Sequence, residues 1–133
     1  MTEIVGNRAI ENAAIAFVIA YEASQGRTAA DTRGEGAPAD VESSDGRIIE
    51  VKAYGTSGRG QDLWLEARQV AEAESNPNFC VYVVYNVRQG DPGSFGLRLL
   101  GGTQLARLVA KKRLQTTYTI PFPVAEYDKA PKT

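Results

Sequence analysis

The sequence of 133 residues contains no histidine, and this absence excludes several kinds of catalytic and metal site. Ser-His-Asp and Cys-His nucleophiles, HNH-type nuclease sites and zinc sites built on imidazole all require that residue. The single cysteine, Cys80, can form neither an intrachain disulfide nor a thiolate metal cluster, which fits a reducing compartment. Catalysis would therefore depend on carboxylates, lysine, arginine, hydroxyls and amides, and a hard cation such as Mg²⁺ is the expected metal.

The sequence also lacks a long hydrophobic run and a strong charge of either sign. Its longest apolar run, residues 13–21, is too short to span a bilayer, and the amino-terminal residues lack the basic region of a signal peptide. We therefore expect a soluble, cytoplasmic protein with no membrane partner. The net charge is −1, but acidic residues predominate in 1–66 and basic residues in 67–133. This asymmetry is compatible with a metal site beside a phosphate-binding surface, and equally with chance.

The composition, with 43% hydrophobic and 23% charged residues, is typical of a globular protein. A chain of this length is sufficient for one compact domain, so residues 1–133 are expected to form a single domain with a core at about 6–112. Residues from about 116 to 133 contain three prolines, and we expect them to form an extended tail over the surface.

The hydrophobic pattern predicts helices and strands in alternation. Apolar residues at helical spacing predict a helix over about 2–24, which Gly26 would end, and Asp62 can cap a second helix that reaches about 75. The run of β-branched and aromatic residues at 79–87 predicts a strand buried on both faces. The other predicted elements are strands near 27–31, 39–43, 47–54 and 95–100, and a helix to about 112 with Leu105, Leu108 and Val109 facing inward.

The candidate chemistry lies on the predicted strand 47–54. Because alternate side chains of a strand share a face, Glu50 and Lys52 project together, about 7 Å apart along the strand. The opposite face carries the apolar residues Ile49, Val51 and Ala53. On spacing alone the acid and the lysine also fit a simple exposed ion pair.

The loop before this strand decides whether Asp40 joins the pair. A two-residue turn would place Asp40 opposite Val51, whereas a three-residue loop with Gly46 in the left-handed region would place Asp40 opposite Glu50. Two facing carboxylates repel unless a cation lies between them. The second register therefore predicts a divalent metal bound by Asp40, Glu50, the Val51 carbonyl and water.

This combination of residues suits the hydrolysis of phosphodiester bonds. A metal would polarise the phosphate and activate water, and the ammonium group of Lys52 would position the nucleophile or neutralise charge on the phosphate. None of these steps requires histidine.

The order of motifs along the chain resembles the NO VEIN C-terminal domain, within the PD-(D/E)xK nuclease superfamily. The resemblance covers roughly residues 6–110. The motifs that carry it are Arg8-Ala9-Ile10-Glu11, Tyr21-Glu22 with Gly26-Arg27, the glycine-rich segment 34–40 ending in Asp40, Ile49-Glu50-Val51-Lys52, Leu65-Glu66-Ala67-Arg68-Gln69, and the apolar strand 81–87.

The resemblance implies a mixed sheet flanked by helices with an αβββαβ core, as in restriction endonucleases. It also implies a nuclease site in which Asp40 and Glu50 are metal ligands and Lys52 is the partner of water or phosphate. Glu11 would support a second metal or orient a ligand, and Gln69 would orient the lysine. Mg²⁺ is the implied metal, with Mn²⁺ as a substitute.

The expected function is therefore that of a Mg²⁺-dependent DNA endonuclease acting in defence or repair, with RNA as the other candidate substrate. Because one site cuts one strand, we expect a homodimer. Two alternatives remain open. In the first, the chain is an inactive nucleic-acid-binding module of the same fold. In the second, it is an interaction domain whose apolar strands and Trp64 form an interface.

Two further features allow more than one interpretation, and two other residues have a single expected role. Trp64 is either a stacking platform for a base or an anchor in a core or interface. The basic run 111–113 contacts phosphate or balances the dipole of a helix C-terminus. Glu22 is expected to pair with Arg27 or water rather than with a metal, and Cys80 to be an inert apolar residue.

Overall fold

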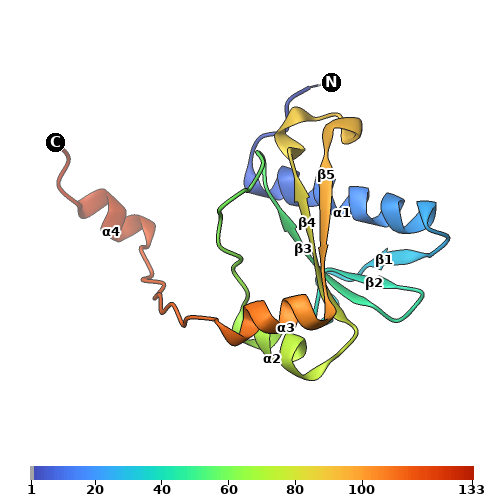
Figure 1. The fold of residues 1–133 in the computed structure, drawn as a ribbon. Coiled ribbons are helices and arrows are strands. Elements are labelled where there is room, and N and C mark those ends of the chain that lie inside the picture. Colours follow the sequence, from blue (N-terminus) through green and yellow to red (C-terminus); the bar gives the residue numbers. More distant parts are fainter. Residues whose placement is uncertain (1) are drawn as a thin grey trace.

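Five strands form one mixed sheet in the computed structural model, which describes residues 2–133, and helices cover both faces of the sheet (Figure 1). In their order across the sheet the strands are β1 (Ala29–Asp31), β2 (Val41–Ser43), β3 (Ile48–Ala53), β4 (Phe79–Tyr85) and β5 (Gly96–Leu100). The helices are α1 (Asn7–Ser24), α2 (Ala67–Ser75), α3 (Gly102–Ala110) and α4 (Val124–Lys129), with 3₁₀ turns η1 (Val87–Gln89) and η2 (Pro92–Ser94). This arrangement confirms the predicted α/β class, and α1 to β4 follow the predicted αβββαβ order.

Helix α1 packs on one face of the sheet through the apolar stripe that predicted it. It begins at Asn7 rather than near residue 2, because Gly6 has a φ of 92° that lies outside the helical region. It ends before Gly26, whose φ of 79° suits a glycine that follows a helix, as predicted. No helix in residues 2–133 is both long and apolar enough to cross a membrane.

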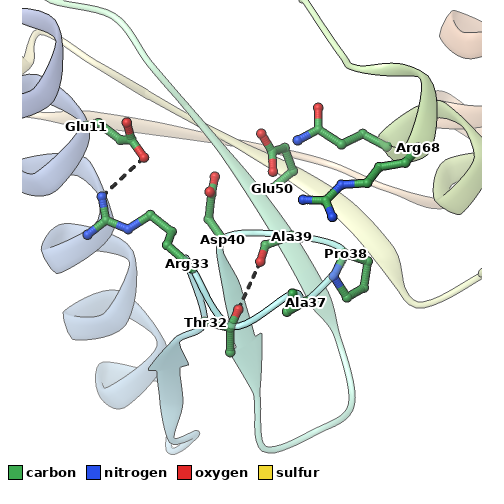
Figure 2. Close-up of a pocket in the computed structure, with 12 residues that line it drawn as sticks. Glu11, Thr32, Arg33, Ala37, Pro38, Ala39, Asp40, Glu50 and Arg68 are labelled. Carbon is green, nitrogen blue, oxygen red and sulfur yellow. Dashed lines mark hydrogen bonds and ion pairs between the residues drawn. The ribbon is translucent and has the colours of Figure 1, made fainter.

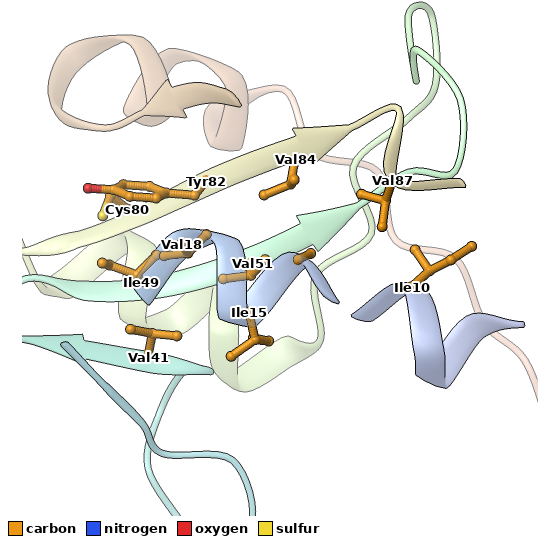
Figure 3. Close-up of a cluster of buried hydrophobic side chains, with 11 residues drawn as sticks. Ile10, Ile15, Val18, Val41, Ile49, Val51, Cys80, Tyr82, Val84 and Val87 are labelled. Atoms are coloured by element: carbon orange, nitrogen blue, oxygen red, sulfur yellow. The ribbon is translucent and has the colours of Figure 1, made fainter. Parts of the chain in front are cut away.

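The parallel strands β3 and β4 lie at the centre of the sheet. Because β4 also pairs with β5, and helices cover both faces, most of its side chains are buried, as predicted. On the α1 face, Ile49 and Val51 of β3 pack with Tyr82 and Val84 of β4 in the larger apolar cluster (Figure 3). Strand β4 ends at Tyr85 rather than at residue 87, because Asn86 adopts the left-handed conformation with a φ of 61°.

Helices α2 and α3 cover the opposite face with a smaller apolar cluster. Leu105 and Val109, one turn apart on α3, are buried, but Leu108 is 48% exposed, so the prediction that all three face inward was wrong for Leu108. The helix contacts the sheet through one stripe, and Leu108 lies outside it. Cys80 is buried in β4, as expected.

The start of α2 and the position of Trp64 also differ from the prediction. Glu66, rather than Asp62, caps α2, and the segment before it is irregular. Trp64 lies in this segment and is 64% exposed, which rules out a place in the core. The tail is not entirely extended either, because it contains the short helix α4 and leaves the body of the protein with every residue from 111 to 133 exposed (Figure 1).

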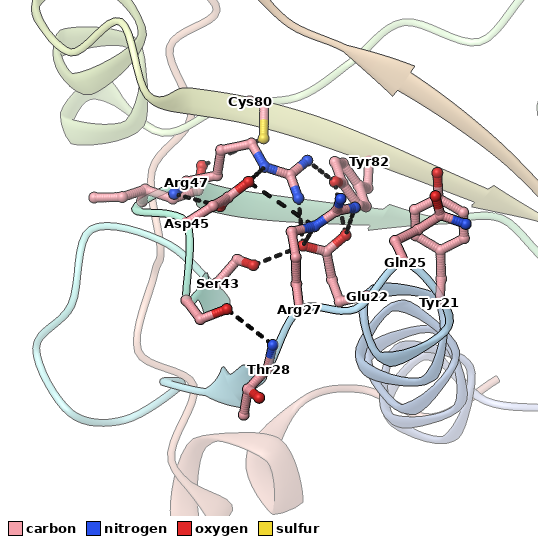
Figure 4. A network of polar contacts seen from close by, with 12 residues as sticks. Tyr21, Glu22, Gln25, Arg27, Thr28, Ser43, Asp45, Arg47, Cys80 and Tyr82 are labelled. Atoms are coloured by element: carbon pink, nitrogen blue, oxygen red, sulfur yellow. Dashed lines mark hydrogen bonds and ion pairs between the residues drawn. The ribbon is translucent and has the colours of Figure 1, made fainter.

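A buried polar network joins α1 to the sheet on the side of β2 (Figure 4). The carboxylate of Glu22 has no exposed surface, and Arg27 donates to its Oε2 at 2.6 Å and to its Oε1 at 2.9 Å. Arg47 also donates to this carboxylate, and the hydroxyl groups of Ser43 and Tyr82 donate to it at 2.7 and 3.1 Å. Glu22 therefore pairs with Arg27, as expected, and with partners that the sequence did not indicate.

The hairpin between β2 and β3 adopts the register that places Asp40 opposite Glu50. Val41 pairs with Ile49, and the amide of Ser43 donates to the carbonyl of Arg47 at 3.0 Å, which leaves a three-residue loop. Gly46 in that loop has a φ of 93°. Strand β2 begins at Val41, two residues later than predicted, so Asp40 lies just before it.

Replacing Gly46 with alanine should lower the free energy of unfolding by about 1 kcal/mol, because an L side chain is disfavoured at positive φ. Urea denaturation measures this loss. Gly46→Asn is the matched control, since asparagine tolerates positive φ better than alanine does and should therefore lose less stability. Equal stability of the two variants would contradict the proposed role of Gly46 in setting the register.

Candidate functional site

Asp40 and Glu50 line a hollow between α1, the β1–β2 loop and the start of α2 (Figure 2). Its volume of about 320 Å³ is sufficient for a hydrated ion, and a second, adjoining hollow shares Glu11, Asp40, Glu50 and Gln69 with it. In Figure 2 the carboxylates of Asp40 and Glu50 point toward the same space. The three-residue hairpin loop thus brings the two acids together, as the second predicted register required.

Asp40 is held by the edge of β3. Its Oδ2 accepts a hydrogen bond of 3.0 Å from the amide of Val51. The N–H and C=O of one strand residue point to the same side, so the Val51 carbonyl also faces this edge. Strand β2 pairs with β3 only up to Ile49, which leaves this carbonyl beyond the end of the ladder and beside Asp40.

Glu50 is the most unusual residue of the site. Its side chain is only 5% exposed, and its Oε2 lies 3.1 Å from the Nζ of Lys52. Its Oε1 is buried and has no hydrogen-bond partner among the described residues. Buried polar atoms are nearly always paired, so an unpaired carboxylate oxygen calls for a specific explanation.

The two carboxyl groups also perturb each other. Burial raises the pKa of Asp40 above its ordinary value. Burial, and then the negative charge of Asp40, raise the pKa of Glu50. The raised pKa of Glu50 means that the pair carries two negative charges only at a cost, which a nearby cation would reduce.

Glu11 lies at the margin of this hollow. Its Oε1 is 3.2 Å from Nη1 of Arg33, and its side chain is 46% exposed. Arg33 also pairs with Asp31, so the Glu11–Arg33 contact belongs to an exposed ion network. No group of three or more His, Cys, Asp or Glu side chains in residues 2–133 is arranged to hold one metal ion. A single ion would therefore use Asp40 and Glu50, with the backbone and water completing its ligands.

Gln69 lies on the wall of both hollows and is 8% exposed, but its side chain has a structural partner. Its Oε1 accepts a hydrogen bond of 2.9 Å from the amide of Glu66 and so completes the capping box of α2. Within residues 2–133 no hydrogen bond joins Gln69 to Lys52. The cap fixes the start of α2 beside the carboxylates.

Two arginines that the sequence did not single out also line the hollow of Figure 2. Arg33 comes from the β1–β2 loop and Arg68 from the first turn of α2. Arg68 forms no ion pair with any described residue, so its guanidinium is available to an anion. The only signal for Arg68 in the sequence was its position beside Gln69. Arg68 and Asp40 are far apart along the chain, so the sequence does not indicate that both line one hollow.

Most of this architecture matches a known protein family. Residues 10–96 match the family described as Protein NO VEIN, C-terminal. The chain belongs to this family. The NO VEIN C-terminal match extends from α1 to the start of β5 and contains all five predicted side chains of the site, Glu11, Asp40, Glu50, Lys52 and Gln69. No curated protein and no solved structure shows significant similarity to this NO VEIN C-terminal chain.

Proposed function

We propose that this chain is a nuclease that hydrolyses phosphodiester bonds of DNA with the help of a divalent metal. The observation that carries the proposal is the buried, unpartnered Oε1 of Glu50, next to Asp40 and on the same carboxylate that contacts Lys52. An unpartnered buried oxygen in a folded protein calls for an explanation, and a bound ion or a catalytic role is one that its position beside Asp40 and Lys52 supports.

The residues present fit a hard divalent cation. Asp40, Glu50 and the Val51 carbonyl would hold it, because oxygen ligands and water are what Mg²⁺ and Mn²⁺ prefer. Once bound, the cation would polarise a phosphate oxygen and make bound water a better nucleophile. The like charges of Asp40 and Glu50 would then face a positive charge, which offsets the cost of their burial.

Lys52 supplies the remaining charge of the proposed site. Its side chain is 23% exposed, so the ammonium group reaches both Glu50 and the solvent side of the hollow. A compact ammonium at this place would orient the attacking water and stabilise negative charge that develops on the phosphate. Arg68 would contact a neighbouring phosphate of the same strand.

The proposed substrate is DNA, in a defence or repair process, and one site would cut one strand. Cleavage of both strands would therefore require two copies of the chain, which is why a homodimer belongs to this proposal.

Plasmid cleavage tests the proposal. The wild-type chain should cut supercoiled DNA with Mg²⁺ or Mn²⁺ and should not cut it with EDTA. Asp40→Asn and Glu50→Gln should each abolish cleavage, whereas Glu42→Gln, an exposed glutamate on the neighbouring strand, should leave it unchanged. DNA binding that persists in EDTA, together with no cleavage when Mg²⁺ or Mn²⁺ is supplied, would instead identify an inactive binding module.

The melting temperature provides a readout that does not depend on activity. Mn²⁺ at about a hundred times its dissociation constant should stabilise the wild-type chain by about 2.7 kcal/mol, a shift on the order of 10 °C. Glu50→Gln should lose this shift. Without metal, this variant should melt at or above the wild-type temperature, because it removes a buried charge with an unpaired oxygen. An identical Mn²⁺ shift in both proteins would contradict metal binding by Glu50.

A further inference from the structure

A separate hollow of about 410 Å³ lies between the segment before α2 and the end of α3. Trp64 and Leu108 line it, and their side chains are 64% and 48% exposed. An exposed indole ring beside a second exposed apolar side chain offers a face on which a planar ligand can stack. The hollow is thus a place where an aromatic surface is open to a ligand.

The same hollow has a strongly cationic wall. The hollow is lined by Lys111, Lys112 and Arg113, which follow α3 directly. Among the described residues that line the hollow, Asp62 is the only acidic one. Arg113 lies 3.6 Å from Asp62, and Lys112 lies 3.0 Å from Glu74. In both pairs each side chain is half exposed or more, so the pairs are weak and readily exchanged for phosphate. Lys111 forms no ion pair within residues 2–133.

We propose that this hollow binds unpaired nucleotides of a nucleic-acid strand. A base would stack on Trp64, and the flanking phosphates would contact Lys111 and Arg113. An aromatic ring beside a row of cations is the usual combination for single-stranded nucleic acid, because every base has a face that can stack and every nucleotide has a phosphate. Leu108 would pack against the edge of the stacked base.

The position of the hollow relates it to the candidate nuclease site, and in this respect the inference rests on the proposed function. Trp64 precedes Glu66 by two residues, so their Cα atoms are at most about 7 Å apart. Glu66 lines the hollow that contains Asp40, Glu50 and Lys52. One short segment of the chain thus lines both hollows, and in this proposal a strand held at Trp64 extends to the carboxylates. The expected substrate of the proposed nuclease is then a nucleic acid with an unpaired stretch beside the position of cleavage.

The tail of a second copy is the competing occupant. It carries exposed apolar side chains, among them Tyr118, Ile120 and Phe122. However, residues 114–133 contain two acidic and two basic side chains, so this segment has no net charge to complement the cations. Charge complementarity favours the nucleic acid.

The intrinsic fluorescence of the protein tests the proposal directly, because Trp64 is the only tryptophan. The full-length chain would be titrated in EDTA, where cleavage is absent, with an oligothymidylate, an oligouridylate and a blunt duplex. We expect at least one of the single strands to quench Trp64 more strongly than the duplex, with an affinity that falls as salt rises. Whichever of the two single strands binds with the higher affinity shows whether the hollow prefers DNA or RNA. Absence of quenching by both, or stronger quenching by the duplex, would overturn the proposal.

The response to protein concentration separates the two occupants. If fluorescence changes on concentration of the protein alone and oligonucleotides have no effect, the hollow accommodates a second copy and the proposal is wrong. Asp40→Asn should retain normal quenching, because Asp40 is not part of this hollow. Failure of the nuclease proposal and failure of this one are thereby distinguished.

Variants measured by anisotropy of a labelled oligonucleotide assign the contacts. Trp64→Ala should weaken single-strand binding about tenfold, Trp64→Phe should retain most of it, and Tyr118→Ala, an exposed aromatic of the tail, should have no effect. Lys111→Gln should reduce the slope of log affinity against log salt by about 0.7, as expected for one lost phosphate contact. Lys132→Gln is the matched control and should not change that slope. Unchanged binding by Trp64→Ala would overturn the stacking contact.

Discussion

Replacing Lys52 with methionine should reduce DNA cleavage by about a hundred- to a thousandfold, the effect expected when one preorganised charge is removed from a transition state. Methionine retains the unbranched stem of lysine but removes the ammonium group that lies 3.1 Å from Glu50. The carboxylates Asp40 and Glu50 remain, so the increase in melting temperature with Mn²⁺ should persist. Loss of activity without loss of metal binding would assign to Lys52 a role in the reaction rather than in the fold.

Cleavage rates at saturating metal, measured on a plasmid and normalised to folded protein, provide the test. Lys129→Met is the matched control, because Lys129 is exposed on α4 and pairs only with Glu126 among the described residues. Lys52→Arg should recover part of the activity, since it restores the charge with a different shape. A Lys52→Met protein that cuts DNA at the wild-type rate would exclude Lys52 from the mechanism.

Glu22→Gln should be the most destabilising of the substitutions considered, with a loss of about 3 kcal/mol or more in the free energy of unfolding. The change removes the charge that compensates Arg27 and Arg47, whose side chains are each only 26% exposed. Urea denaturation at neutral pH measures the loss. Glu42→Gln, on an exposed position of β2, should change stability by less than about 0.5 kcal/mol.

Because of the same network, the free energy of unfolding should decrease as the pH becomes acidic. The hydrogen bond from Arg27, followed by those from Ser43 and Arg47, lowers the pKa of Glu22 from 4.5 to about 2 against the opposing effect of burial. A folded-state pKa below the unfolded value means that the stabilisation is complete above about pH 4.5. It is lost as the pH falls toward 2, by about 3 kcal/mol in total.

Stability curves of the wild-type and Glu22→Gln proteins between pH 6 and pH 2 reveal this contribution. The wild-type curve should fall more steeply below about pH 4.5, so the difference between the two proteins should shrink as the pH decreases. Parallel curves would mean that Glu22 has an ordinary pKa and that the network contributes little through its charge.

Local sequence determined most of the secondary structure and the faces of the central strands. The alternation in β3 separates Ile49 and Val51 from Glu50 and Lys52, and the structure retains this separation. The continuous β-branched and aromatic run of β4 was recognisable as a strand covered on both faces, and most of its side chains are buried. These features follow from backbone preferences and from periodicities of two or 3.6 residues, which neighbouring residues encode by themselves.

Only the tertiary structure decided which of these residues meet. The sequence allowed two hairpin registers, and the left-handed conformation of Gly46 in a three-residue loop placed Asp40 opposite Glu50. The burial of Glu50 depends on α1, α2 and the β1–β2 loop, which are far apart along the chain. The exposure of Trp64 beside Lys111 likewise depends on how α3 packs near the segment before α2. Burial and long-range pairing come from the packing of distant elements, so no local pattern of residues specifies them.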